Sequence, residues 1–171
     1  MSERVFLGLG SNIGDRRANM RAALRWLAPE CDVVAVSSLY RSEAVVLEGQ
    51  LPGPEYLNAA CEVRTALSPD ELLDHVKRIE HDIGRRPGER WAPRPIDIDV
   101  LLYGSRAIGT ERLTIPHPLL GERAFVLAPL AEIARDVVHP AARRTIEEMA
   151  RAAGHAGVER VAGPDWASGL G

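Results

Sequence analysis

The chain has 171 residues, a net charge of −3, and a composition of 46% hydrophobic and 26% charged residues. A chain of this length and composition builds one globular core, and it contains no apolar run long enough to cross a bilayer. The slightly negative charge argues against binding to a long nucleic acid, which would need a basic face.

Apolar periodicity predicts a regular succession of strands and helices along the first two thirds of the chain. Asp15 can cap a first helix. A second helix is predicted to begin at the capping box Ser68-Pro69-Asp70-Glu71 and to end at Gly84. Strands are predicted at residues 4–10, 33–40, 56–65 and 96–103. The order strand, helix, strand, strand, helix, strand is that of an α+β, ferredoxin-like fold. Such a fold has a mainly antiparallel sheet with helices on one face and, we expect, the active site on the other.

Between the second and third strands, residues 43–55 form a long Gly- and Pro-containing loop that suits a functional role. After Tyr103 we expect a short extended piece at 113–116, an apolar run at 125–130 and a helix near 143–153. We predict a single domain over residues 1–153 and a loosely ordered tail over residues 154–171.

The cysteines and the N-terminus give two further expectations. Cys31 and Cys61 match no metal-binding or redox spacing and lie in or beside strand-like segments, which favours buried, reduced thiols. No secretory signal is visible at the N-terminus, so we expect a cytoplasmic location and no membrane partner.

An aspartate pair in the fourth predicted strand is the leading candidate for chemistry. Side chains alternate along a strand, so Ile96, Ile98, Val100 and Leu102 should face the helices while Asp97 and Asp99 point to the open face. The same alternation in the third strand places Asn58 on that face. The aspartate Cα atoms would lie roughly 6.6 Å apart, so the carboxylates could bind one divalent cation or flank two.

An arginine-rich segment runs into this strand. Arg85, Arg86, Arg90 and Arg94 fall within ten residues that contain no lysine, and neighbouring prolines restrict the backbone that presents them. Oxygen ligands suit Mg²⁺, and arginines suit bidentate binding of phosphate. The alternative is a charged surface loop beside a solvated or salt-bridged acid pair, which is what such sequences more often form.

Other motifs are weaker. Glycines at 8, 10 and 14 follow a strand, but the third glycine is one position late for a dinucleotide fingerprint, and no P-loop sequence exists. We expect these glycines to serve a tight turn and a close approach of the backbone. Phosphate or ribose could be bound by a second polar group: Arg112, Thr114, His117 and Arg123. Trp91 and Phe125 are either packing anchors or the two sides of a slot for a planar ring.

Four segments together resemble the 6-hydroxymethyl-7,8-dihydropterin pyrophosphokinases of folate biosynthesis, over residues 4–135. The segments are Gly8-Leu9-Gly10-Ser11-Asn12, Tyr56-Leu57-Asn58-Ala59-Ala60, Glu89-Arg90-Trp91-Ala92-Pro93-Arg94-Pro95-Ile96-Asp97-Ile98-Asp99 and Leu113-Thr114-Ile115-Pro116-His117-Pro118. The resemblance implies transfer of pyrophosphate from MgATP to the hydroxymethyl group of a reduced pterin, with release of AMP, by a monomer on a ferredoxin-like fold.

The resemblance also implies roles by position. Catalytic positions are Asp97, Asp99, Arg85 and Arg94, and the two aspartates would hold two Mg²⁺ ions. ATP-binding positions are Lys77, Glu80, Arg90, Ile98, Arg112, Thr114, His117 and Arg123. Pterin-binding positions are Ser42, Val45, Tyr56, Asn58, Trp91 and Phe125.

Two other kinds of protein fit parts of the pattern. Another Mg²⁺-dependent transferase that uses a nucleotide would also need the Asp97/Asp99 pair. A non-catalytic ferredoxin-like module, regulatory or RNA-binding, would share the fold, but acids on the open face repel phosphate unless metals intervene. We therefore expect small-molecule partners, ATP and a reduced pterin, and no nucleic acid.

Overall fold

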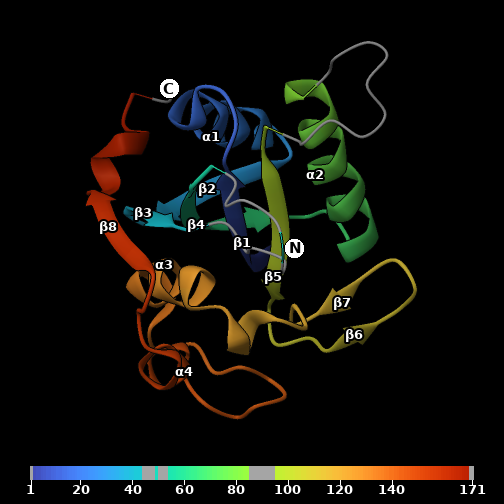
Figure 1. Cartoon of the computed structure of the whole chain (residues 1–171). Coiled ribbons are helices and arrows are strands. Elements are labelled where there is room, and N and C mark those ends of the chain that lie inside the picture. The colour runs from blue at the N-terminus through green and yellow to red at the C-terminus, as the bar shows by residue number, and fades with distance from the viewer. Residues whose placement is uncertain (1, 44–48, 50–53, 85–94, 170–171) are drawn as a thin grey trace.

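The computed structural model describes residues 2–43, 49, 54–84 and 95–169. Within this part a six-stranded antiparallel sheet has the order β5-β1-β4-β3-β8, and β2 also pairs with β4 (Figure 1). A second, two-stranded sheet joins β6 and β7. The elements are β1 (Glu3–Ser11), α1 (Arg16–Leu27), β2 (Cys31–Val36), β3 (Leu39–Ser42), β4 (Tyr56–Thr65), α2 (Pro69–Ile83), β5 (Asp97–Tyr103), β6 (Ile108–Gly109), β7 (Thr114–Ile115), the 3-10 turn η1 (Leu120–Glu122), α3 (Ala124–Ala134), α4 (Ile146–Ala153), β8 (Val158–Ala162) and the 3-10 turn η2 (Pro164–Ala167).

The predicted helix starts are confirmed. The Asp15 carboxylate accepts a hydrogen bond from the Ala18 backbone at 3.0 Å and caps α1. At α2, Ser68 and Glu71 exchange side-chain-to-backbone hydrogen bonds of 3.2 and 2.9 Å, which is a complete capping box. The ferredoxin-like order of elements is likewise confirmed, and both cysteines are buried and free.

The predicted strand at 33–40 is divided into β2 and β3, so that prediction is wrong in detail. The break falls at Ser37 and Ser38, which are fully buried. The Ser37 hydroxyl accepts from the Ala60 backbone at 2.9 Å and donates to the Ser38 carbonyl at 2.8 Å. Side-chain hydrogen bonds thus replace part of the regular ladder and let the chain bend between the two strands.

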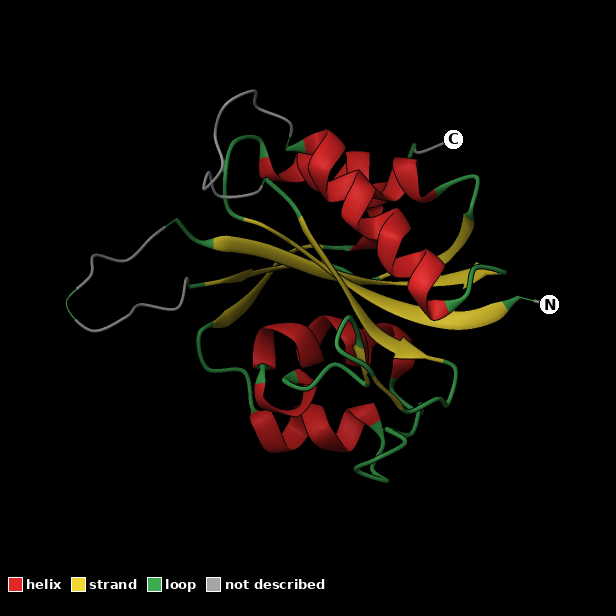
Figure 2. Ribbon diagram, turned by 90° about the vertical axis from the view of Figure 1, so that its right-hand side faces the viewer, coloured by secondary structure: helices red, strands yellow, loops and turns green. Residues whose placement is uncertain are grey.

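Helices cover both faces of the sheet rather than one, which corrects the expectation of a single helical layer (Figure 2). Helices α1 and α2 pack on the larger core, whereas α3 and α4 pack on a second core around Phe6, Leu102 and Leu127. The apolar run at 125–130 is the source of the second layer, because it folds as helix α3. The open part of this face is therefore limited to the end of the sheet where β5 begins.

A bulge in β5 corrects one more expectation. Ile96, Ile98 and Val100 face the α1/α2 core as predicted, but Leu102 lies in the second core. The register with β1 shifts between Phe6 and Leu7, which leaves Leu101 as an extra residue and reverses the alternation after it. Asp97 and Asp99 precede the bulge, so their predicted orientation is unaffected.

The tail is ordered where we expected it to be loose. Residues 158–162 form β8 and pair with β3, and the indole of Trp166 is buried and donates to the Ser37 carbonyl at 2.8 Å. Alternation in β8 is weak because most of its side chains are exposed. Backbone pairing with a distant strand and one buried aromatic ring hold this segment in place.

Truncating Trp166 should therefore destabilise the whole fold. Trp166→Ala is expected to lower the free energy of unfolding by about 3–5 kcal/mol, because it leaves a cavity and an unpaired carbonyl. Trp26, which is 42% exposed on α1, is the control, and Trp26→Ala should cost about 1 kcal/mol or less. If urea denaturation gave equal losses of unfolding free energy for Trp166→Ala and Trp26→Ala, the C-terminal segment would not contribute to the core.

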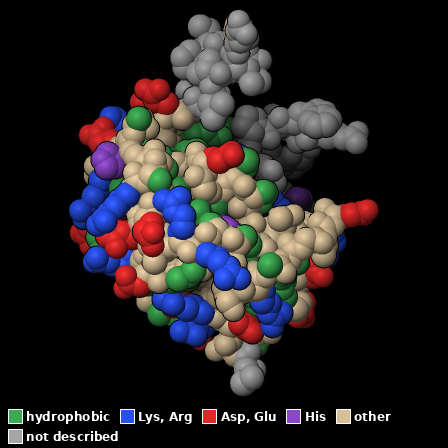
Figure 3. Space-filling view, turned by 90° about the horizontal axis from the view of Figure 1, so that it is seen from below, with side chains coloured by type: hydrophobic (Ala, Val, Ile, Leu, Met, Phe, Trp, Pro, Cys, Tyr) green, Lys and Arg blue, Asp and Glu red, His purple; other side chains and the backbone are tan. Residues whose placement is uncertain are grey.

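The surface of the molecule carries charges of both signs. Lys and Arg side chains are interspersed with Asp and Glu side chains on the face shown in Figure 3. Arg135 and Arg151 both form ion pairs with Glu147, at 3.4 and 3.0 Å. None of the helices in the described residues has the length and apolar character needed to span a membrane.

Acid sensitivity is expected from His139, before α4. Burial lowers the pKa of His139 below its ordinary value of 6.5, and its Nδ1 accepts from the Ala141 and Ala142 backbones at 3.1 and 2.9 Å. The unfolded chain then binds a proton more readily, so stability falls as the pH drops below about 6.5. His139→Asn keeps an acceptor but cannot titrate, and it should reduce the stability lost between pH 7.5 and 5.5. If denaturation at the two pH values showed the same loss of stability for His139→Asn as for the wild type, this expectation would be wrong.

Candidate functional site

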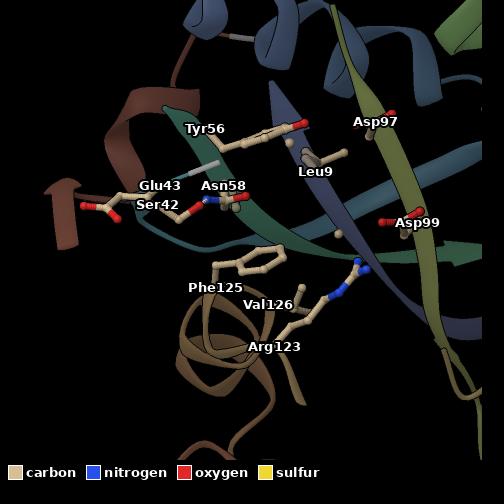
Figure 4. Close-up of a pocket in the computed structure, with 13 residues that line it drawn as sticks. Leu9, Ser42, Glu43, Tyr56, Asn58, Asp97, Asp99, Arg123, Phe125 and Val126 are labelled. Atoms are coloured by element: carbon tan, nitrogen blue, oxygen red, sulfur yellow. Dashed lines mark hydrogen bonds between the residues drawn. The ribbon is translucent and has the colours of Figure 1, made fainter. Parts of the chain in front are cut away.

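A cavity of about 270 Å³ opens where β5, β1, β4 and β3 meet the start of α3. Figure 4 shows side chains from all these elements around it. Its polar and aromatic side chains include an acidic side on β5, an aromatic and amide side on β3, β4 and α3, and a basic residue, Arg123, directly before α3. The predicted residues Asp97, Asp99, Ser42, Tyr56, Asn58, Arg123 and Phe125 all line this cavity.

The acidic side is built by strand pairing. Asp97 and Asp99 lie opposite Gly10 and Gly8 of β1, and both carboxylates are half-buried at the cavity wall. A Cβ on Gly10 would lie 3.6 Å from the amide oxygen of Asn58. This is an ordinary van der Waals distance, so the fold would accept a small side chain here, but glycine leaves the space beside Asn58 open.

The amide side centres on Asn58, which is only 5% exposed. Its amide nitrogen donates to the Ser42 hydroxyl at 2.7 Å, which fixes the orientation of the amide. In Figure 4, Asn58 lies between the rings of Tyr56 and Phe125. Burial raises the pKa of Tyr56, and the negative charge of Asp97 raises it further. Tyr56 therefore stays protonated at neutral pH.

The basic side joins the two others. The Arg123 guanidinium lies 5.6 Å from the centre of the Phe125 ring and extends toward Asp99 in Figure 4. His117 lies close by. Burial lowers the pKa of its ring, the negative charge of Asp99 raises that pKa, and the positive charge of Arg123 lowers it. Its Nδ1 accepts from the Leu119 backbone at 3.2 Å, so the neutral ring carries its proton on Nε2.

Several residues expected at the nucleotide lie away from this cavity. Glu80 is 2% exposed and binds Lys77 and the backbone of Ile98, whose own side chain is buried under the helices. Arg112 forms ion pairs with Asp70 and Asp74 of α2, and Thr114 is exposed on β7. The exposed residues among them, Lys77, Arg112 and Thr114, form a second surface along α2 and β7, beside β5.

Five predicted residues lie outside the described residues: Val45, Arg85, Arg90, Trp91 and Arg94. Most of the loop at 43–55 lies outside them too. The structure adds Gly8, Gly10, Glu43 and Val126 to the cavity. The sequence points to the glycines through their unusual spacing after the first strand. Only the register of β1 with β5 shows which residues they face.

The donor set fits a hard cation that also binds substrate. Among residues 2–43, 54–84 and 95–169, no group of three or more His, Cys, Asp and Glu side chains could hold a metal ion alone. Two carboxylates on one wall are the protein ligands that Mg²⁺ typically uses when substrate phosphates and water complete its shell. The arrangement therefore suits a metal that arrives with a phosphorylated substrate.

Two carboxylates opposite a fixed amide between two aromatic rings suit one class of protein: a transferase that binds a phosphate donor with its metal and a planar acceptor ring. The comparison with known families agrees with this class. The chain belongs to the 7,8-dihydro-6-hydroxymethylpterin-pyrophosphokinase (HPPK) family, whose model matches residues 6–135. It is thus an enzyme of the ATP-dependent diphosphotransferase type.

Curated relatives support the family over most of the chain. The chain is 40% identical over 145 residues to the 2-amino-4-hydroxy-6-hydroxymethyldihydropteridine pyrophosphokinase of Aquifex aeolicus, covering 85% of this chain and 89% of that one. It is 44% identical over 139 residues to the Bacillus subtilis protein of the same name, covering 80% and 81%.

Solved structures support the fold. The wild-type HPPK-DHPS of Plasmodium falciparum matches 89% of this chain with a TM-score of 0.71 at 14% identity. This chain spans only 45% of that longer protein, so the likeness concerns the arrangement of elements in one part of it.

Proposed function

We propose that this chain transfers the pyrophosphoryl group of MgATP to the hydroxymethyl oxygen of 6-hydroxymethyl-7,8-dihydropterin and releases AMP, a step of folate biosynthesis. One observation carries the proposal: the acid pair of β5 and the Asn58 amide, set between two rings, share one cavity in a chain of this family. A planar ring held at Asn58 would have its substituent near the acids, where a phosphate chain and its metals would lie.

The pterin side provides shape and hydrogen bonds. A pterin is flat and carries donors and acceptors along one edge, and a primary amide can both donate to and accept from such an edge. Ser42 holds the Asn58 amide from behind, while Tyr56 and Phe125 pack against the ring faces. We assign Val45 and Trp91 to the same pocket from the family resemblance.

The phosphate side provides charge. Asp97 and Asp99 would hold two Mg²⁺ ions, which when bound neutralise the phosphate charge. Arg123 and His117 lie beside Asp99 and can contact the phosphate oxygens. From the resemblance we assign Arg85, Arg90 and Arg94 to the phosphates and the surface along α2 and β7 to the nucleotide. The exposed residues of this surface are Lys77, Arg112 and Thr114, and the assignment includes Glu80 and Ile98, which lie buried beneath it.

The reaction needs positioning more than covalent chemistry. The hydroxymethyl oxygen attacks the β-phosphorus in line, the new oxygen–phosphorus bond forms, the bond from the β-phosphorus to the α-phosphate oxygen breaks, and AMP leaves. The hydroxyl proton passes to solvent. The contribution of this chain is to hold the two substrates in line and to neutralise charge.

Competition binding distinguishes this function from that of another nucleotide-dependent transferase. With a non-hydrolysable ATP analogue and Mg²⁺ present, the reduced hydroxymethylpterin should bind to the protein, and a hundredfold excess of glucose or guanosine should not displace it. Displacement by either compound, together with weak pterin binding, would assign the cavity to a different acceptor. We also propose that the protein is a monomer, which sedimentation equilibrium tests.

A further inference from the structure

The backbone just before Asp97 is held by the turn that follows β1. The buried Ser11 hydroxyl donates to the Pro95 carbonyl at 2.5 Å, and the Asn19 amide nitrogen lies 3.4 Å from the same oxygen. Pro95 also packs closely on Gly84, where an added Cβ would lie 2.8 Å from the proline Cδ. The start of β5 is therefore fixed by contacts with two other parts of the chain.

The glycine-rich motif at residues 8–14 explains how Ser11 and Asn19 meet. Gly14 has φ of +70°, a conformation that favours glycine, and it reverses the chain between β1 and α1. Asn19, in the second turn of α1, donates to the Ile13 carbonyl at 2.9 Å and lies 3.4 Å from the Ser11 hydroxyl. The motif thus builds a rigid turn whose polar groups converge on Pro95.

The backbone just after Asp97 is held from the opposite side. β5 is an edge strand, and the Ile98 N–H donates to the Glu80 carboxylate of α2 at 2.9 Å rather than to a neighbouring strand. Glu80 is 2% exposed, and its other oxygen lies 2.9 Å from the Lys77 ammonium. A buried carboxylate is costly unless it is paired, and each oxygen of Glu80 has a partner, the Ile98 N–H or the Lys77 ammonium.

We propose that Ser11 and Glu80 are positioning residues that fix β5 on both sides of Asp97 and thereby set the placement of the Asp97 and Asp99 carboxylates. The proposal rests on the proposed function, because the carboxylates matter through the metals and phosphates they hold. Displacing a reacting group by about 1 Å can cost about a hundredfold in rate, so small shifts of an edge strand have large consequences. Both residues act on the acid pair through the backbone on either side of Asp97, and for Glu80 this role is separate from its assignment to the nucleotide.

The test uses metal affinity as well as turnover. With a non-hydrolysable ATP analogue present, Ser11→Ala should weaken Mn²⁺ binding about tenfold in calorimetry, raise the Mg²⁺ concentration for half-maximal rate about tenfold, and leave pterin affinity within about threefold. Glu80→Leu should weaken Mn²⁺ binding similarly, whereas Glu80→Gln should restore most of it because the amide oxygen accepts from the Ile98 N–H.

Thr65→Val is the matched control. Thr65 is equally buried and donates to the Glu30 carbonyl at 2.9 Å, but it pairs with Glu3 at the far end of β1, whereas Ser11 is the last residue of β1. Thr65→Val should lower the melting temperature about as much as Ser11→Ala does. Unlike Ser11→Ala, it should leave the Mn²⁺ affinity unchanged. Equal Mn²⁺ affinities for Ser11→Ala and Thr65→Val would overturn the role of Ser11, and equal affinities for Glu80→Leu and Glu80→Gln would overturn that of Glu80. Failure of the wild type to form AMP would instead reject the proposed function, while the Mn²⁺ affinities would still decide the positioning roles.

Discussion

Replacing Asp97 or Asp99 with alanine should reduce kcat by at least about a thousandfold while leaving pterin affinity within about tenfold. The two carboxylates lie on the side of the cavity that we propose for the phosphates, and other residues from β3, β4 and α3 build the side proposed for the pterin. The loss should therefore appear in turnover and in metal dependence. Steady-state kinetics at several Mg²⁺ concentrations and calorimetry with the pterin measure the two effects separately.

Two further variants make this result specific. Asp97→Asn keeps the size of the side chain and removes its charge, so it should lose nearly as much turnover as Asp97→Ala. Asp32 is an exposed aspartate on β2 outside the cavity, and Asp32→Ala should retain full activity. High activity of Asp97→Asn, or loss of pterin binding in the Asp97 variants, would contradict the assignment of the acids to the phosphate side.

Replacing Asn58 with alanine should have the opposite signature. We expect kcat/KM for the pterin to fall by about 10²–10³-fold, with little change in the affinity for an ATP analogue, because the pterin edge would lose its partner in a buried site. Asn58 is 5% exposed, so water cannot easily replace the lost amide. Kinetics with varied pterin and calorimetry with the ATP analogue give the two quantities.

Ser42→Ala is the companion variant. Ser42 accepts a hydrogen bond from the Asn58 amide and orients it, so its removal should cost less than removal of the amide itself, about tenfold in kcat/KM for the pterin. An effect of Asn58→Ala on ATP-analogue affinity as large as its effect on the pterin would show that Asn58 does not belong to the pterin side.

Local sequence rules predicted the parts of the fold that local physics decides. The caps at Asp15 and Ser68 are set by side chains within one turn of the helix they begin. The orientation of Asp97, Asp99 and Asn58 follows from strand alternation, which holds until the bulge at Leu101. Alternation therefore predicts that these three side chains share the open face of the sheet, and in the structure they line one cavity.

What the sequence could not predict depends on contacts between distant residues. The bulge at Leu101 arises from the register with β1, and β8 forms because β3 offers a free edge and the core accommodates Trp166. Helix α3 has an almost wholly apolar sequence, so its pattern alone did not separate it from a buried strand. The contacts of Ser11 and Glu80 with β5 also join residues that are far apart in the sequence, so local patterns do not predict them. Val45, Trp91 and the arginines of residues 85–94 stay predictions.

The fate of the β-phosphorus of ATP tests the central claim most directly. The protein is incubated with ATP, Mg²⁺ and 6-hydroxymethyl-7,8-dihydropterin, and the products are followed by ³¹P NMR and anion-exchange chromatography. We expect AMP together with a pterin that carries two coupled phosphorus atoms. ADP with a singly phosphorylated pterin, or intact ATP with correctly folded protein, would contradict it.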